Sequence, residues 1–209
     1  MNKKLIQWMG LTGIATLLSY TAAVIFAPAA YPGYNWMRQA VSDLSAQNAP
    51  SRMLWNQLAA IYNICSVVCP TCVSIYVSEN KTASKTFRTG VYLFTIMCWI
   101  SNIGYAMFPL NNAGKEIATF QEMMHIAVTA IVVVLSIVSL VLIIFAGFKN
   151  QDVRGVSIFA FIAFFMMLIG AVGQGMVPPK YFGIVERFSV FAAVGFNAVL
   201  GIQLFQGFH

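Results

Sequence analysis

The feature that most constrains this chain is a succession of six apolar runs, each close to the length that crosses a bilayer. In hydrocarbon every backbone amide and carbonyl needs a partner inside the protein, so runs of this kind form helices and not isolated strands. We therefore predict an all-α integral membrane six-helix bundle, with a single transmembrane domain over residues 1–209. The predicted spans cover about residues 5–27, 53–77, 87–108, 119–147, 156–177 and 188–208.

The composition excludes an ordinary soluble domain. Hydrophobic residues make up 59% and charged residues 9% of the chain, whereas soluble domains have about 45–50% and about 25%. The net charge of +6 comes from basic residues scattered between apolar runs, which indicates contact with lipid head groups and not with nucleic acid. The first run, Leu5 to Ala27, is longer than the core of a secretory signal, about 7–15 residues, and we expect a retained anchor.

The distribution of Lys and Arg between the runs predicts the orientation. If the N-terminus is cytoplasmic, the inner connections are short and hold the larger basic group. We therefore expect a multi-pass protein of the cytoplasmic (inner) membrane with both termini in the cytoplasm. The seven inner residues are Lys3, Lys4, Lys81, Lys85, Arg88, Lys149 and Arg154, and the five outer ones are Arg38, Arg52, Lys115, Lys180 and Arg187.

The first outer connection, "YPGYNWMRQAVSDLSAQNAP", is the longest and has helical periodicity. Its apolar residues share one helical face, while its polar residues lie elsewhere. We expect a short amphipathic helix here, lying on the bundle or at the membrane interface, which either seals the outer mouth or moves as a lid. The apolar face consists of Trp36, Met37, Ala40, Val41 and Leu44.

Four short segments outside the apolar cores form a distinctive set. They are the first outer connection with Asn56 downstream, "MFPL" at the end of the third run, His125 at the start of the fourth, and "GIVERF" before the last. Together they resemble the bacterial and archaeal membrane family catalogued as domain of unknown function 998. The resemblance covers nearly the whole chain and departs at Ser45, where glycine is expected. It implies a multi-pass helical bundle and supplies no activity.

Glu122 and His125 open the fourth run three positions apart, so on a helix they share a face. Helical di-metal proteins use Glu-x-x-His in this way, but they need two copies and two further glutamates. This chain has one copy, which could hold a single zinc or iron ion with Asp43 or Glu186 and leave a position for water. The alternative is a hydrogen-bonded histidine at the interface beside a solvated glutamate.

Most acidic residues, namely Asp43, Glu116, Glu122 and Glu186, fall with His125 on the predicted outer side. Ionisable residues at membrane depth usually face a bundle interior or a water-filled cavity, so we expect a polar pocket that opens outward. One hypothesis for catalysis makes Ser42 a nucleophile and His125 its base, and Asp43 is a further candidate catalytic residue. The expected lining residues are Arg38, Asp43, Glu122, His125, Gln174, Glu186 and Arg187.

The second run contains "CSVVCPTC", with Cys65, Cys69 and Cys72. The Cys-Pro-Thr-Cys spacing is that of a redox motif, but such a motif needs a lowered thiol pKa from a helix N-terminus or a positive neighbour. Its position deep within a span favours packing thiols and a proline kink instead. For Asn63, Asn102, Asn197 and Gln203 inside the spans we expect hydrogen bonds between helices.

Three classes of function remain open. The leading interpretation is a membrane protein whose outward-facing pocket binds a lipid or another amphiphile, with membrane lipids as its surroundings and no cofactor required. The second is a hydrolase or transferase acting on a lipid-like substrate through a metal at Glu122, His125 and Asp43. The third is a scaffold that contacts other membrane proteins without catalysis.

Overall fold

The computed structural model describes residues 3–113 and 119–208, so Lys115, Glu116 and His209 lie outside the described residues. All regular structure in the described part is helical, and six helices are long and apolar enough to cross a membrane. The predicted all-α, six-helix membrane fold is therefore confirmed, and the chain is a multi-pass membrane protein. The long helices are α2 (Leu11–Phe26), which crosses together with its flanking short helices over Leu5–Ala30, α4 (Ala60–Glu79), α5 (Lys85–Met107), α6 (Phe120–Lys149), α7 (Arg154–Gly173) and α8 (Phe182–Gln206).

Two of the predicted spans are interrupted. A short helix, α1 (Leu5–Trp8), precedes α2, and α3 (Arg52–Leu58) precedes α4 with a break at Ala59. The Ser19 hydroxyl spans the second break, because it donates to the Leu58 carbonyl and accepts from the Tyr62 amide. Backbone groups freed by the break thus keep partners inside the bundle, as a membrane interior requires.

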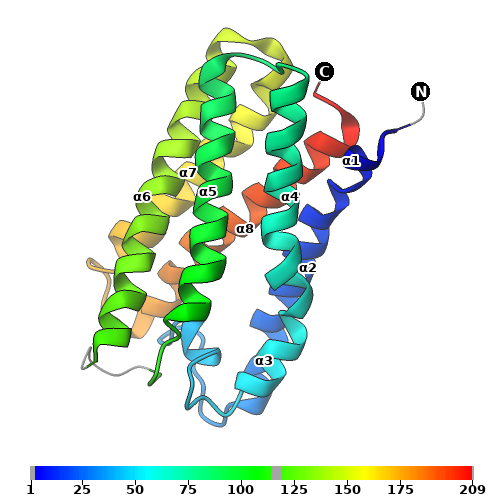
Figure 1. The fold of residues 1–209 in the computed structure, drawn as a ribbon. Helices are drawn as coiled ribbons and strands as arrows, with labels where there is room; N and C mark the ends of the chain where they lie inside the picture. Colours follow the sequence, from blue (N-terminus) through cyan, green and yellow to red (C-terminus); the bar gives the residue numbers. More distant parts are fainter. Residues whose placement is uncertain (1–2, 114–118, 209) are drawn as a thin grey trace.

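Helices that follow one another in the chain pack side by side, and α8 closes the bundle against α2 and α4 (Figure 1). At the crossing of α2 and α8, a Cβ atom on Gly10 would overlap the Gly201 carbonyl oxygen, and the reverse is also true. Glycine at both positions lets the two backbones approach closely, a common device in membrane bundles. The largest fully buried side chains elsewhere include Phe87, Phe94, Leu140, Phe196 and Leu200.

Pro70 lies inside α4 and removes one backbone donor from the helix. The carbonyl left without its usual partner belongs to Ser66, and Asn197 Nδ2 of α8 donates to it at 3.1 Å. Asn102 likewise links α5 to α4 by donating to the Asn63 carbonyl at 2.6 Å. These contacts confirm the expected hydrogen bonds between helices at Asn197 and Asn102. The cysteines are free thiols, and Cys69 is fully buried beside the kink, which agrees with a packing role.

The described chain begins and ends at the same end of the bundle (Figure 1). The short connections between α4 and α5 and between α6 and α7 lie at that end as well. The opposite end carries the three longer connections, and we call it the loop end. It comprises the described residues of 27–59, 108–119 and 174–181.

Candidate functional site

The first connection of the loop end does not form the expected amphipathic helix. Residues 31–50 consist of turns and one turn of 3-10 helix, η2 (Ser42–Leu44). The reason is long-range hydrogen bonding, because backbone groups that a helix would pair locally are bonded to side chains of α8. The apolar residues Val41 and Leu44 are still buried, so the periodicity identified the inward residues and not the backbone conformation.

Arg187, one turn into α8, holds this connection in place. Its Nη1 donates to the carbonyl oxygens of Trp36 at 2.8 Å, Gln39 at 3.1 Å and Gly183 at 2.7 Å. Its Nη2 donates to the Tyr34 hydroxyl at 2.7 Å. A guanidinium presents several donors in a rigid plane, so one side chain can fix several carbonyl groups at once. We call Arg187 with its bonded partners the arginine clamp.

Two neighbours on α8 complete the attachment. Glu186 Oε2 accepts from the Val41 amide at 3.1 Å, and the Gly183 amide donates to the Met37 carbonyl at 2.9 Å. A Cβ atom at position 183 would overlap the carbonyl oxygens of Trp36 and Gln39, so the close approach of the connection depends on glycine. Three residues at the start of α8 therefore replace the hydrogen bonds of a local helix.

Tyr34 links the arginine clamp to a further backbone group of the first connection. Its hydroxyl accepts from Arg187 and donates to the Ala40 carbonyl at 2.9 Å. Burial raises the pKa of the Tyr34 phenol, while the neighbouring guanidinium opposes that rise. The phenol is thus neutral at physiological pH and able to donate, which the bond to Ala40 requires.

Asp43 lies in η2 and is 5% exposed. Its Oδ2 accepts from the Ala40 amide at 3.2 Å, and its charge acts on the carboxylate of Glu186. Asp43, Glu186 and Arg187 therefore lie in one polar cluster. That they line a pocket stays a prediction. Arg38, from the same connection, is exposed, and Gln174 lies partly exposed directly after α7.

Glu122 and His125 have other roles. Glu122 is 3% exposed, and its Oε2 accepts from the backbone amide and the hydroxyl of Thr119, while Thr119 accepts from the Glu122 amide. This is a capping box that starts α6. His125 Nδ1 bonds the Phe108 carbonyl at 2.8 Å and its ring lies 4.9 Å from the ring of Tyr105. The pair joins the start of α6 to the end of α5.

These contacts bear on the hypotheses of catalysis. Within residues 3–113 and 119–208, no group of three or more His, Cys, Asp and Glu side chains could hold a metal ion. The proposed ligands Glu122, His125 and Asp43 are therefore not gathered around one point. His125 is hydrogen-bonded to a carbonyl, and its bonds to described residues do not include Ser42. The described geometry thus supplies neither the metal centre nor the Ser-His pair.

The connection between α5 and α6 also forms hydrogen bonds with the first connection. The amides of Gln47 and Asn48 donate to the carbonyls of Leu110 and Asn111 at 2.8 Å and 3.3 Å. Asn48 Nδ2 also donates to Asn112 at 3.1 Å. The first connection therefore lies between α8 and the α5–α6 connection, with hydrogen bonds to both.

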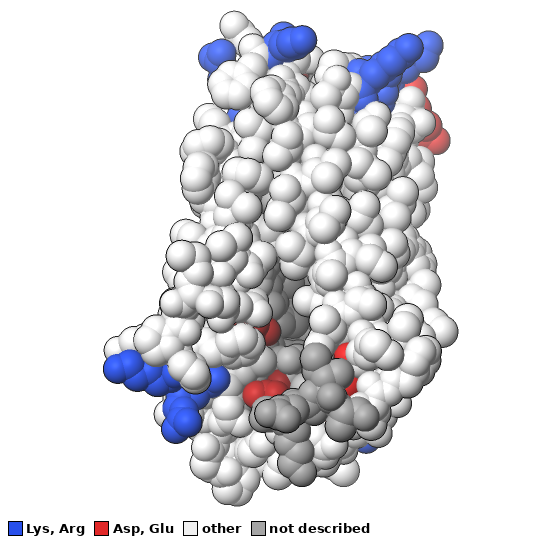
Figure 2. Space-filling model, turned by 90° about the vertical axis from the view of Figure 1, so that its left-hand side faces the viewer, with Lys and Arg blue, Asp and Glu red and all other residues white. Residues whose placement is uncertain are grey.

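The surface near the loop end is hollowed, and acidic side chains gather around the hollow (Figure 2). The described acidic residues of this end are Asp43, Glu122 and Glu186, which three different segments contribute. Arg187, the basic residue next to Glu186, directs its donors to carbonyl groups of the first connection and of Gly183.

Several residues of the site were not predicted from the sequence. Thr119 carried a readable signal, because Thr119-x-x-Glu122 before an apolar run is a capping-box pattern. No sequence pattern identifies Tyr34 or Gly183, since their roles depend on contacts between segments about 150 residues apart.

A family model described as "Protein of unknown function (DUF998)" matches residues 14–203. No curated protein and no solved structure matches the chain.

Proposed function

The chain belongs to the DUF998 family of proteins of unknown function, and we propose that its loop end is a binding site for an amphiphile. The polar head group would occupy the hollow between Asp43, Glu122 and Glu186, and the apolar part would lie along the membrane-facing side of α8. We further propose that the loop end faces away from the cytoplasm. The basic residues of the short connections and the N-terminus support that orientation.

The observation that carries the proposal is the acid-lined hollow beside a clamp whose donors are already used. Acidic side chains gather around the hollow (Figure 2), and Arg187 on α8 is committed to the first connection. Such a surface favours a ligand that brings hydrogen-bond donors or positive charge, because carboxylates accept strong charge-assisted bonds. The head group of choice is therefore an amine or a cluster of hydroxyls and not a bare phosphate.

For the apolar part of the ligand we propose a groove deeper in the membrane. A groove of about 240 Å³ runs between α7 and α8. Phe191 lines it and stands four residues after Arg187 on α8, so the two lie on the same helix face. The other lining residues are Phe159, Ile162, Ala163, Met166, Ala192, Gly195, Phe196 and Val199.

The test is co-purification. Protein extracted in a mild detergent would be exchanged into a defined synthetic lipid, and the amphiphile retained per protein would be measured by mass spectrometry. Glu186→Gln should lower retention about tenfold, because hydrogen bonds to charged groups contribute about 1.5–3 kcal/mol. Glu79→Gln is the matched control, since Glu79 is exposed at the opposite end. Equal retention by both variants, or no amphiphile retained by the unmodified protein, would contradict the proposal.

The orientation has its own test. In a background without the four cysteines, a single cysteine at Asn112 should react with a membrane-impermeant label added outside the cell. A single cysteine at Asn80 should react only after the membrane is opened. The reverse pattern would place the hollow in the cytoplasm and refute the outward-facing site.

A further inference from the structure

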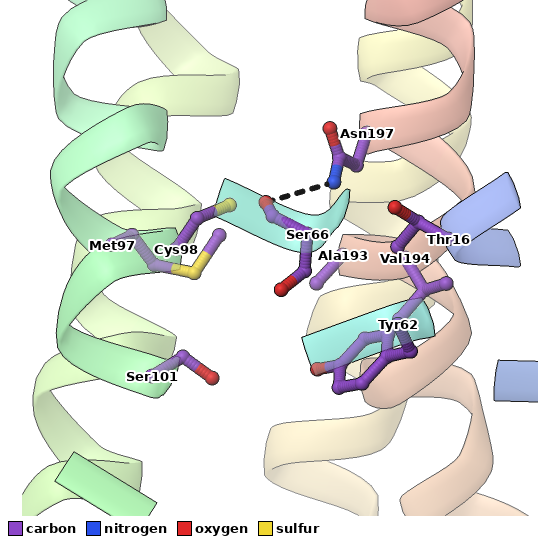
Figure 3. Close-up of a pocket in the computed structure, with 9 residues that line it drawn as sticks. All are labelled: Thr16, Tyr62, Ser66, Met97, Cys98, Ser101, Ala193, Val194 and Asn197. Carbon is purple, nitrogen blue, oxygen red and sulfur yellow. Dashed lines mark hydrogen bonds between the residues drawn. The ribbon is translucent and has the colours of Figure 1, made fainter. Parts of the chain in front are cut away.

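A polar cavity lies inside the bundle, between α2, α4, α5 and α8 (Figure 3). Its volume is about 30 Å³. All four helices are membrane spans, so the cavity is at bilayer depth, and Asp43, Glu122 and Glu186 of the loop end do not line it. The lining residues are Thr16, Tyr62, Ser66, Met97, Cys98, Ser101, Ala193, Val194 and Asn197.

Asn197 is the first sign that the cavity is occupied. Its side chain is 2% exposed, and Nδ2 donates to the Ser66 carbonyl that the kink at Pro70 leaves unpaired. Its Oδ1 is buried and has no hydrogen-bond partner in the described part of the chain. A buried acceptor of this kind is rare in native proteins, and an ordered water is one of its usual partners.

The hydroxyl groups of the cavity are the second sign. Figure 3 shows the hydroxyls of Tyr62, Ser66 and Ser101 directed into one space from α4 and α5. Those of Tyr62 and Ser101 make no hydrogen bond with any residue in 3–113 or 119–208. Two hydroxyls that face a common space without protein partners define a place where a small hydrogen-bonding molecule fits.

We infer that this cavity is a binding site for internal water. A water needs at least about 10–15 Å³ of such space and two to four polar partners, so the cavity accommodates about two molecules. Its lining carries hydroxyl and amide groups and no Asp, Glu, Lys or Arg, so it offers hydrogen-bond partners and no side chain that would balance the charge of a bare ion. The water completes the hydrogen bonds of the kinked region of α4 and links it to α5. This inference is independent of the amphiphile site.

The test uses the side chains of the cavity as reporters. When X-rays split a bound water, the hydroxyl radical oxidises the nearest reactive side chains, and here these are Met97 and Cys98 of the cavity wall. Met167 is the control inside the same protein, because Met97 and Met167 are both 2% exposed but Met167 lies in the packed core away from the cavity. Met97 and Cys98 should be oxidised several-fold faster than Met167 in the protein reconstituted in lipid.

A pair of variants sharpens the result. Ser101→Leu fills the space and should reduce oxidation of Met97 and Cys98 to the rate of Met167, whereas Ser101→Ala keeps the space and should preserve fast oxidation of both. Ser78→Leu, at an exposed position of α4, is the matched control and should change nothing. Should Ser101→Leu fail to fold, the unmodified protein still decides the matter. Equal oxidation of Met97 and Met167 there, or fast oxidation that persists in folded Ser101→Leu, would overturn the inference.

Discussion

Two pairs of ionisable residues at the loop end differ in what they hold together. Glu186 and Arg187 on α8 bond the first connection, about 150 residues earlier in the chain. Glu122 and His125 on α6 bond Thr119 and Phe108, which are close in sequence. The first pair fixes a tertiary contact across the bundle, and the second fixes the local turn between two consecutive helices.

The difference shows why the hydrogen-bond partner of one charged residue can be predicted from the sequence and that of another cannot. A capping glutamate works within its own helix, so its partner is set by spacing along the chain. An arginine that binds carbonyl groups of an irregular segment has no such spacing rule, because its partners are chosen by the fold. If this comparison is correct, the two pairs should respond differently to substitution.

The largest effect is expected for Arg187→Ala. The substitution leaves the carbonyls of Trp36 and Gln39 without their donor and leaves Glu186 beside an empty space. We expect a loss of about 2–4 kcal/mol in the free energy of unfolding, since bonds to charged groups are worth about 1.5–3 kcal/mol each and are not additive. Thermal unfolding in detergent measures this loss. Arg38→Ala is the matched control because Arg38 is exposed in the same connection, and it should change stability by at most about 0.5 kcal/mol.

Gly183→Ala tests the same attachment without changing charge. Its added methyl group would overlap two carbonyl oxygens of the first connection, so that segment must move away from α8. We expect a loss of about 1–3 kcal/mol, as for other cases of overpacking. Gly155→Ala provides the control, because a Cβ atom there meets open space and the helix gains propensity. Equal stability of the two variants would show that the close approach at Gly183 is relaxed in the membrane.

Thr119→Ala addresses the local pair. It removes the side chain that accepts from the Glu122 amide and donates to its carboxylate. Loss of an N-cap costs about 1 kcal/mol. The first turn of α6 should fray, which a spin label at exposed Met123 would report as faster motion. Unchanged motion at Met123 would mean that Glu122 is held by other contacts.

His125→Ala should have the smallest effect on the first connection. It removes one hydrogen bond to the Phe108 carbonyl and one ring contact with Tyr105, worth together about 0.5–2 kcal/mol. The imidazole does not bond the first connection among the described residues, so protease cleavage between Tyr34 and Asn48 should stay as in the unmodified protein. Increased cleavage there would instead place His125 in the same cluster as Asp43.

The sequence was sufficient for the six-helix architecture because membrane spans are determined by length and apolarity, which are local properties. Topology alone brings the segments of Asp43, Glu186 and Arg187 to one end, so their proximity follows from the order of the spans, while a pocket lined by them stays a prediction. The amphipathic helix was wrong because side chains of α8 replaced the local hydrogen bonds of residues 36–41. The water cavity depends on how four helices pack around the kink at Pro70, and no short pattern encodes that arrangement.

The most direct test of the account is hydrogen exchange of the first connection in three proteins. The unmodified protein, Arg187→Ala and His125→Ala would be compared in lipid, with exchange followed in peptides covering residues 34–44. We expect much faster exchange in Arg187→Ala, because the Val41 amide and its neighbours lose their attachment to α8, and unmodified exchange in His125→Ala. Protection that survives in Arg187→Ala, or that is lost equally in His125→Ala, would contradict the claim that Arg187 of α8, and not His125, holds residues 34–44 in place.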